Sequence, residues 1–300
     1  MRPAVLALAL ACAWAAAVAG CGSGEGDGEP VVVATTTHVG DLVANVAGGR
    51  MEVHTLLTPA ADPHEYEPRP SDARAVADAA VVVRAGGEVD AWLDDVVANA
   101  GGDATVVTLS DHVRLREDDP HWWQDPANAV RAVAAIRDAL IEADPEGAAA
   151  YRRNAARYVS AIRALDRRIA ACMRAIPRER RKLVTTHEGY GYFAGRYGIE
   201  LVGAVLPSRS GQASPSAGET AALVRRIRAE GVRAIFPESP LDPRLERAIA
   251  EEAGVAVGDR LFADALGPEG SGGDTYLRAL AHDADALARG FTGGRRGCSR

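Results

Sequence analysis

Residues 145–176 read PEGAAAYRRNAARYVSAIRALDRRIAACMRAI, and this stretch decides the fold. Pro145 in a first turn is a helix start signal, and no Gly or Pro interrupts the pattern between Ala148 and Ile176. Apolar side chains recur at three- and four-residue steps, at Tyr158, Ile162, Leu165, Ile169 and Met173. A helix of about 30 residues is about 45 Å long, well above the usual length. We predict one spine helix over 145–177 that joins two domains; two helices with a break, or the seam of a coiled-coil dimer, are the alternatives.

Strand-like and helix-like segments alternate on both sides of the spine helix. Before it, we predict strands at 31–35, 51–57, 80–84 and 104–109, and helices at 41–47, 71–79, 89–98 and 127–142. After it, we predict strand-like segments at 182–186, 200–206, 232–236 and 255–261, and helices at 216–230, 244–253 and 274–289. This alternation predicts parallel strand pairing in an α/β fold. The expected lobes cover 31–144 and 178–290, and a frayed tail covers 291–300.

The first 20 residues are typical of an export signal and not of a folded element. Arg2 is followed by an apolar, Ala-rich run that ends in Val18-Ala19-Gly20-Cys21, and a Gly-rich stretch follows. This looks like a bacterial lipoprotein signal, so we predict a signal peptide over 1–20, lipidation of Cys21 and a flexible tether over 21–30. An ordinary cleaved signal or an uncleaved anchor is the alternative. No later segment is long and apolar enough to span a bilayer, and we expect a chain anchored by lipid outside the cytoplasm.

The composition excludes some classes of function. Three hundred residues suffice for two domains of ordinary size, and 47% apolar with 25% charged residues is typical of a globular chain. The net charge of −7 argues against nucleic acid as a partner, because phosphate binding needs a basic face.

Two cysteines remain once the signal is set aside. Cys12 belongs to the signal and Cys21 carries the expected lipid, which leaves Cys172 and Cys298. In an oxidising compartment these two can pair and tie the C-terminal tail to the spine helix. Two unpaired thiols are the alternative, since the sequence does not give the Cα separation that decides pairing.

Four separate residues of metal-ligand type each follow a predicted strand. They are His64, His121, His187 and Asp264, two from each half of the chain. In open α/β sheets, ligands bind beyond the carboxyl ends of the strands, so these side chains can meet in one cleft between the lobes. Three neutral imidazoles and one carboxylate suit zinc well and manganese passably. No pair has the local spacing of a zinc finger or of H-E-x-x-H, so the whole fold must assemble the site.

Each candidate also has a purely structural interpretation. A lone histidine in a turn is usually a surface residue, and we assign to the surface His38, His54, His112 and His282. Asp264 can cap a helix, and we expect Asp274 to cap the last one. Glu238 follows a strand and is either a support for a ligand or an additional ligand. We expect Trp122 and Trp123 to pack at the cleft wall.

Four motifs carry a family resemblance over nearly the whole mature chain. They read DPHEYEPRPSD (62–72), HWWQDP (121–126), HEGYGYFAGRYGI (187–199) and LFADALG (261–267). In this order they resemble the metal-binding solute-binding lipoproteins of bacterial zinc and manganese ABC transporters, the cluster 9 family. The resemblance implies two α/β lobes joined by a long helix, a metal in the cleft, and the four residues above as its ligands. It also implies a monomer that delivers a divalent metal to a membrane permease and has no enzymatic activity.

The metal is expected to be zinc, with manganese as the alternative. The third ligand position in the family is His or Glu; here it is His187, and a nitrogen-rich set favours zinc over the harder manganese. Many zinc-specific members carry a long His-rich loop before the second ligand. This chain has only residues 109–120 there, with His112 and several acids, which keeps manganese open.

Two other classes of protein fit some of these features. An extracytoplasmic zinc hydrolase can use His187 as a ligand and Glu188 as a general base, and an adhesin can hold a purely structural metal. Four protein ligands close a tetrahedral zinc site and leave no position for a reactive water. The ligand set therefore favours metal capture over hydrolysis.

Overall fold

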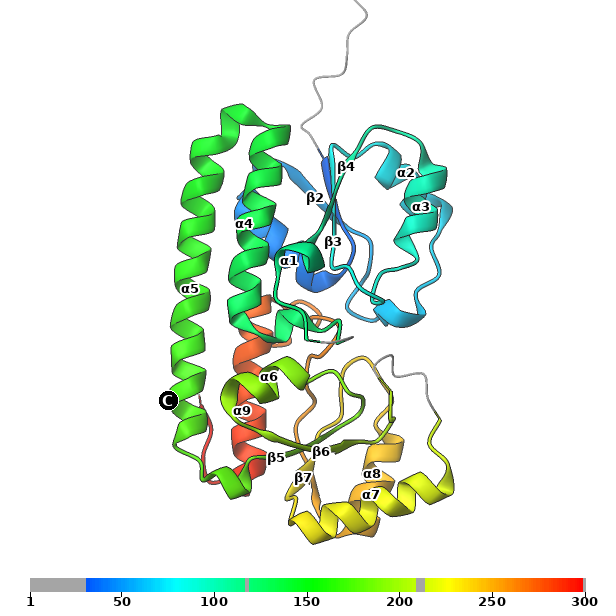
Figure 1. The fold of residues 1–300 in the computed structure, drawn as a ribbon, viewed down its shortest axis with the longest axis vertical. Helices are drawn as coiled ribbons and strands as arrows, with labels where there is room; N and C mark the ends of the chain where they lie inside the picture. Colours follow the sequence, from blue (N-terminus) through cyan, green and yellow to red (C-terminus); the bar gives the residue numbers. More distant parts are fainter. Residues whose placement is uncertain (1–30, 117–118, 209–213, 299–300) are drawn as a thin grey trace, which may run out of the picture.

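The structure is a computed structural model that describes residues 31–116, 119–208 and 214–298 (Figure 1). The expected signal peptide over 1–20, the lipid site at Cys21 and the tether over 21–30 lie outside the described residues. Two α/β lobes follow one another along the long axis, and one long helix runs beside both (Figure 1). Among the helices in the described part of the chain, none combines the length and apolar character needed to cross a bilayer.

The N-terminal lobe is built on a parallel sheet of order β2-β1-β3-β4. Its strands are β1 (Val31–Ala34), β2 (Glu52–Thr55), β3 (Val81–Arg84) and β4 (Thr105–Thr108). Its helices are α1 (Thr37–Ala47), α2 (Pro70–Ala77), α3 (Leu93–Ala100) and α4 (Pro126–Ala143). Successive strand residues point to opposite faces, so Val32 joins the core under α1 and α4 while Val33 joins the core under α2 and α3. Burial on both faces accounts for the uninterrupted valine runs of β1 and β3.

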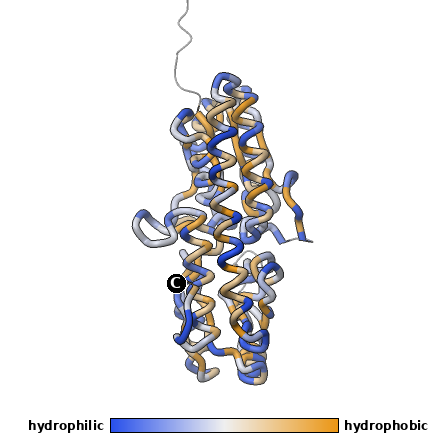
Figure 2. Tube along the Cα trace, turned by 90° about the vertical axis from the view of Figure 1, so that its left-hand side faces the viewer, coloured by the Kyte–Doolittle hydropathy of each residue, from blue (hydrophilic) through white to orange (hydrophobic). Residues whose placement is uncertain are grey.

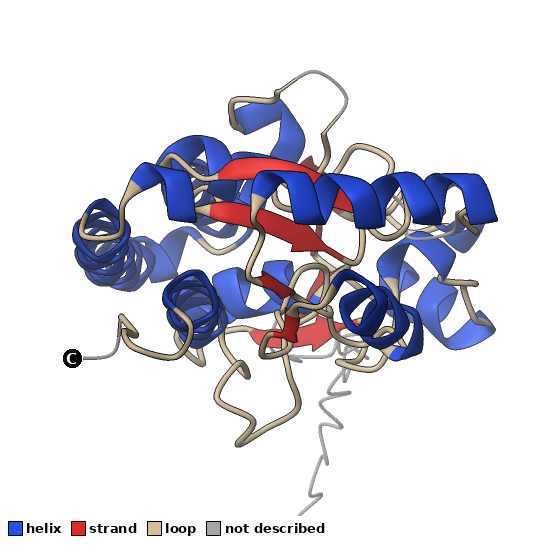
Figure 3. Ribbon diagram, turned by 90° about the horizontal axis from the view of Figure 1, so that it is seen from below, coloured by secondary structure: helices blue, strands red, loops and turns tan. Residues whose placement is uncertain are grey.

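In the C-terminal lobe, strands and helices again alternate along the chain. Its strands are β5 (Lys182–Thr185), β6 (Glu200–Ala204), β7 (Ala234–Ile235) and β8 (Ala256–Val257). Its helices are α6 (Gly191–Tyr197), α7 (Ala217–Glu230), α8 (Arg244–Ala253) and α9 (Tyr276–Thr292). The parallel pairs β5-β6 and β7-β8 meet where the backbone N–H of Phe236 donates to the carbonyl of Val184 at 2.9 Å. Helices cover the strands of this lobe, as the view from below shows (Figure 3).

The spine is a single unbroken helix, α5 (Ala148–Arg174), of 27 residues. The short turn η4 (Pro145–Gly147) precedes it, so the predicted helix is slightly too long at both ends. The predicted apolar stripe is buried, and with Tyr151 and Ala155 it consists of Tyr158, Ile162, Leu165, Ile169 and Met173. This stripe packs within the chain on α1, α4 and α9, so no second copy is needed to cover it. The predicted α/β fold with two lobes and one long helix is therefore confirmed.

One predicted helix start and one predicted helix cap are wrong. The helix α2 begins at Pro70 and not at residue 71, with Arg69 as its N-cap, because a proline fits the first turn. The Asp72 carboxylate accepts from the backbone N–H of Arg69 at 2.7 Å and so helps to cap this helix. Asp274 does not cap α9; Thr275 does, because its side chain accepts a first-turn backbone N–H. Residue preferences at helix ends locate a helix cap only to within one or two residues.

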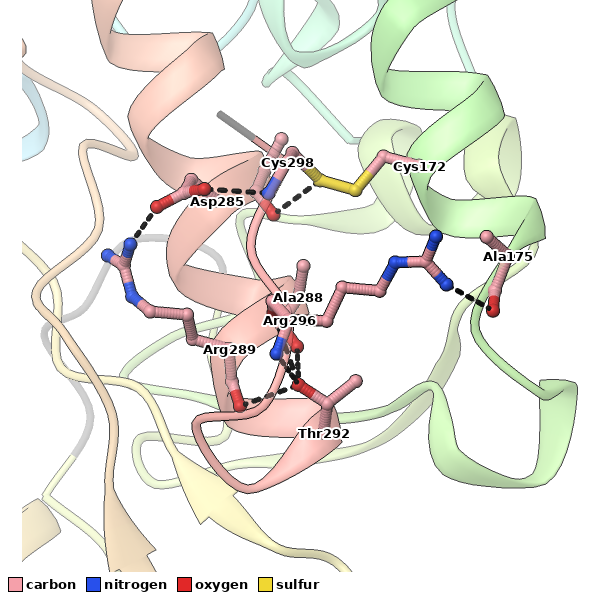
Figure 4. Close-up of a disulfide and its surroundings, with 9 residues drawn as sticks. Cys172, Ala175, Asp285, Ala288, Arg289, Thr292, Arg296 and Cys298 are labelled. Carbon is pink, nitrogen blue, oxygen red and sulfur yellow. Dashed lines mark hydrogen bonds and ion pairs between the residues drawn. A yellow bond between two sulfur atoms is a disulfide. The ribbon is translucent and has the colours of Figure 1, made fainter. Parts of the chain in front are cut away.

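The C-terminal segment is ordered further than expected. The helix α9 continues to Thr292, and a disulfide joins Cys298 to Cys172 of α5, with Cα atoms 5.5 Å apart (Figure 4). The backbone N–H of Cys298 also donates to Asp285 at 2.6 Å. The expectation of a frayed tail from residue 291 is therefore wrong up to Cys298, because a covalent link and hydrogen bonds hold this segment.

Candidate metal centre

The fold brings the four candidate ligands together between the lobes. His64 lies in the turn η1 (Pro63–Glu65) after β2, and His121 directly precedes the turn η3 (Trp122–Gln124). His187 follows β5, and Asp264 lies between β8 and α9. One ligand atom from each of the four residues lies within 4.8 Å of the others. All four are buried or nearly so, and His121 and His187 are fully buried.

The separations of these atoms are short enough for them to surround one ion. The Nε2 atom of His187 lies 3.2 Å from Nε2 of His121 and 3.1 Å from Oδ2 of Asp264. The Nε2 atom of His121 lies 3.4 Å from Oδ1 of Asp264, and that of His64 lies 3.7 Å from Oδ2. Ligands at zinc–ligand distances of 2.0–2.1 Å in a tetrahedron are about 3.3 Å apart. Four of the separations, measured to the two oxygens of Asp264, are near this value, and all four groups lie within 4.8 Å of one another, so they can surround one ion.

A buried carboxylate fixes the ring of His121. Asp119 accepts a hydrogen bond from Nδ1 of His121 at 2.8 Å and another from its backbone N–H at 3.1 Å. An ionised carboxylate can only accept, so the ring proton sits on Nδ1 and the lone pair of Nε2 faces the centre. Asp119 was not among the predicted site residues, although it lies only two residues before His121.

Glu238 plays the same part for His187. Its carboxylate accepts from Nδ1 of the His187 ring and from the His187 backbone N–H, the latter at 3.2 Å. Glu238 is almost fully buried and is not among the four clustered ligands, so its place is behind His187. The Nδ1 atoms of both rings are thus held by carboxylates, and their Nε2 atoms, 3.2 Å apart, face the same centre.

The charges at the centre suit a cation. Burial lowers the pKa of His64 to about 4, against the opposing effect of Asp264, so this ring is neutral. Burial alone raises the pKa of the Asp264 carboxyl, but His187 and His121 outweigh it and hold that pKa well below its usual range. Burial lowers the pKa of His187, whereas Asp264 and Glu238 together hold it well above its ordinary value. The buried Asp264 carboxylate is thus balanced by a proton on the His187 ring, and a metal ion can replace that proton.

Groups of the N-terminal lobe hold the segment that carries Asp264. The indole Nε1 of Trp123 donates to the carbonyl of Ala263 at 2.8 Å. The backbone N–H of Leu266 donates to Oγ1 of Thr37 in α1 at 2.8 Å. Because the chain is fixed across the lobe boundary at Ala263 and again two residues after Asp264, the position of this carboxylate depends on contact between the lobes.

The predicted surface position of His38 is wrong. Its ring is buried and stacks on Trp123, with the ring centroids 5.5 Å apart, and burial lowers its pKa to about 4. The reason is that α1 begins at Thr37, four residues before the predicted start, so His38 shares the buried face with Leu42. The four-residue spacing of His38 and Leu42 is the signal that could have revealed this. His54 and His112 are exposed as predicted, and His282 is half-buried.

Two further expectations concern the surroundings of the ligands. Trp122 and Trp123 are both buried; Trp123 packs against His121, with ring centroids 5.4 Å apart, and Trp122 donates to the carbonyl of Ala85 at 3.0 Å. The side chain of Glu188, the general base in the hydrolase interpretation, is exposed and is not one of the clustered residues.

Comparison with known proteins agrees with the architecture. The family described as zinc-uptake complex component A, periplasmic (ZnuA), matches residues 32–290. The manganese-binding lipoprotein MntA of Halalkalibacterium halodurans is 33% identical over 267 residues, covering 87% of this chain and 88% of that protein. The metal ABC transporter substrate-binding lipoprotein SsaB of Streptococcus sanguinis is 26% identical over 275 residues, covering 87% and 88%. The periplasmic zinc binding protein TroA from Treponema pallidum superposes with a TM-score of 0.83 at 27% identity, covering 88% of this chain and 99% of that structure.

These matches confirm the resemblance expected from the four motifs. They support a divalent-metal-binding protein of an ABC importer that is anchored by lipid outside the cytoplasm. Proteins of this kind bind substrate for a transporter and are not enzymes, which removes the hydrolase alternative. The chain belongs to the zinc-uptake complex component A family, the metal-binding solute-binding lipoproteins of metal ABC transporters.

Proposed function

We propose that this chain captures zinc outside the cytoplasm and delivers it to an ABC importer. The proposed ligands are Nε2 of His64, His121 and His187 and the carboxylate of Asp264. The observation that carries the proposal is the spacing of these atoms, with four ligand-to-ligand distances of 3.1 to 3.7 Å. Because relatives are named for zinc and for manganese, the choice of metal rests on the site itself.

The chemistry of the site favours zinc. Three imidazole nitrogens and one carboxylate form a nitrogen-rich set, whereas manganese prefers a larger number of oxygen ligands. Two of the three rings have a buried carboxylate behind them, Asp119 and Glu238, which makes those nitrogens better donors. Both lobes contribute ligands, so metal-free and metal-bound states can differ in how the lobes meet, and a transporter can read that difference.

The first test is the stoichiometry and the geometry of the bound metal. We expect the mature chain, purified without added metal, to bind one zinc ion per chain and to prefer zinc to manganese in competition. Nitrogen-containing sites in general favour zinc over manganese, so affinity alone is not decisive. Cobalt(II) bound in the same site should therefore show the intense visible absorption of tetrahedral coordination. The weak absorption of six-coordinate cobalt would contradict the zinc proposal and favour manganese.

Zinc affinity should depend on pH. Imidazoles bind metal only when neutral, so protons compete with zinc, and affinity should fall roughly tenfold or more between about pH 7.5 and about pH 5.5. Titration calorimetry in buffers of different ionisation enthalpy should also detect proton release on binding. An affinity that does not change over this range would argue against imidazole ligands.

Glu238→Gln should weaken zinc binding without unfolding the protein. An amide keeps the shape of the carboxylate but removes the charge that supports His187. Loss of such a partner typically costs about 10- to 100-fold in metal affinity. The matched control is Glu251→Gln, which changes an exposed glutamate of α8 and should leave affinity unchanged. Equal affinities for the two variants would show that Glu238 does not support the ligand.

A further inference from the structure

The outward side of α5 carries an unusual concentration of arginine. Seven arginines lie on this helix, all exposed: Arg152, Arg153, Arg157, Arg163, Arg167, Arg168 and Arg174. We call them the arginine face. At 3.6 residues per turn they fall within an arc of about 160°, centred opposite the buried stripe of the same helix. Figure 2 looks onto this side of the molecule, where hydrophilic positions recur along the long helix.

Among the described residues, no ion pair neutralises the arginine face, although the Asp166 carboxylate interacts electrostatically with Arg167. The one acidic residue of α5, Asp166, lies towards the protein and pairs with Arg196 of α6. Within the described chain, none of the seven arginines takes part in an ion pair. A solvated helix usually mixes signs with favourable pairs four residues apart, but here Arg153 and Arg157 are like charges at that spacing, as are Arg163 and Arg167. A helix surface with this pattern loses stability unless an anion is present.

The charge is local and not a property of the whole chain. The chain has 34 basic and 41 acidic residues, whereas α5 has seven basic and one acidic. Outside α5 there are therefore 27 basic and 40 acidic residues. A chain that is acidic overall thus presents one strongly basic flank.

Two surface pockets border the arginine face. A hollow of about 590 Å³ between α4 and α5 is bordered by Arg137, Arg152, Arg163 and Arg167. A second, of about 840 Å³, lies beside the disulfide and is bordered by Arg168, Arg289, Arg295 and Arg296, and also by Asp285, which pairs with Arg289. Arg296 is held there because its guanidinium donates to the carbonyl of Ala175 at 3.3 Å (Figure 4). Phosphate groups can enter such hollows and meet guanidinium groups on more than one side.

We propose that the arginine face docks on anionic phospholipid headgroups of the membrane to which the chain is anchored. Guanidinium groups match phosphate oxygens in geometry and charge, and basic residues near an anionic bilayer are drawn to it. Nine residues lie between Cys21, the expected lipid site, and Val31, so the ten steps from one to the other span at most about 35 Å. The helix α5 is about 40 Å long, so this flank remains within reach of the bilayer. The docked protein lies with its long axis along the membrane that holds the importer.

The test uses the mature chain from residue 21 with Cys21→Ser, so that no lipid contributes to binding. Vesicles of phosphatidylcholine containing about 30% phosphatidylglycerol should bind it in a sedimentation assay, and pure phosphatidylcholine should not. The test variant combines Arg157→Ala, Arg163→Ala and Arg167→Ala, which favours the helix and removes three charges. The matched control combines Arg74→Ala, Arg225→Ala and Arg247→Ala, at exposed positions on α2, α7 and α8.

We expect the test variant to lose at least about tenfold in vesicle affinity, since each basic residue near an anionic surface strengthens binding by up to about fivefold. The control should lose less than about twofold, and raising the salt concentration should weaken binding of the unsubstituted protein. The proposal is overturned if anionic and neutral vesicles bind equally, or if both triple variants lose the same affinity. It is also overturned if the arginine face instead holds a second copy, seen as a salt-sensitive dimer in sedimentation that the test variant abolishes. Zinc affinity should be the same in all three proteins, so this outcome is separate from that of the metal proposal.

Discussion

His121→Ala is expected to weaken zinc binding by at least about a hundredfold. Removing the partner of a ligand already costs about 10- to 100-fold, and removing the ligand itself costs more. His121 is fully buried, and its Nε2 atom lies 3.2 Å from that of His187 and 3.4 Å from the Asp264 carboxylate. Alanine therefore leaves three ligands and a gap at the centre. Competition with a chromophoric chelator measures the change in dissociation constant.

The control for this variant is His112→Ala. His112 is an exposed histidine nine residues earlier in the same connection between β4 and α4. Its loss should leave zinc affinity within about twofold. If His121→Ala binds zinc as tightly as His112→Ala does, His121 is not a ligand and the proposed centre is wrong.

Breaking the disulfide should cost about 3 kcal/mol of unfolding free energy, within the range of 2–4 kcal/mol usual for such links. Cys172 and Cys298 are 126 residues apart, so the link restricts a long loop in the unfolded chain. It also ties the segment after α9 to α5, next to the hydrogen bond from Cys298 to Asp285. Urea unfolding of the Cys172→Ala, Cys298→Ala double variant against the oxidised protein measures the loss.

The control for the disulfide prediction is the zinc affinity of the double variant. The disulfide joins α5 to the chain after α9, and neither of these carries a proposed ligand. The double variant should therefore bind zinc normally, and a reducing agent should destabilise only the unsubstituted protein. A change in unfolding free energy below about 0.5 kcal/mol would mean that the link contributes little, as for many surface substitutions.

The sequence alone predicts most of the architecture because the patterns that specify its helices and strands extend over many residues. The spine helix is recognisable from more than 25 residues without Gly or Pro and from a stripe of apolar side chains at helical spacing. The buried strands β1 and β3 are recognisable from their valine runs. The helix α6 was not predicted, because Gly189 and Gly191 flank its start and glycine disfavours helix. Burial of Phe193 and Tyr197 stabilises it instead, and that contribution depends on tertiary packing.

The site was predictable in composition but not in detail. Each of His64, His121, His187 and Asp264 follows a strand, yet no local spacing joins them, and only the four motifs taken together indicated one site. The partnership of Glu238 with His187 links residues 51 positions apart, which no sequence pattern specifies.

The most direct test of the central claim is anomalous diffraction at the zinc absorption edge from crystals of the zinc-bound mature chain. The account predicts one peak between the lobes, about 2.0–2.2 Å from Nε2 of all three histidines and from a carboxylate oxygen of Asp264. A peak elsewhere in the molecule, or an ion bound by only one lobe, would contradict it.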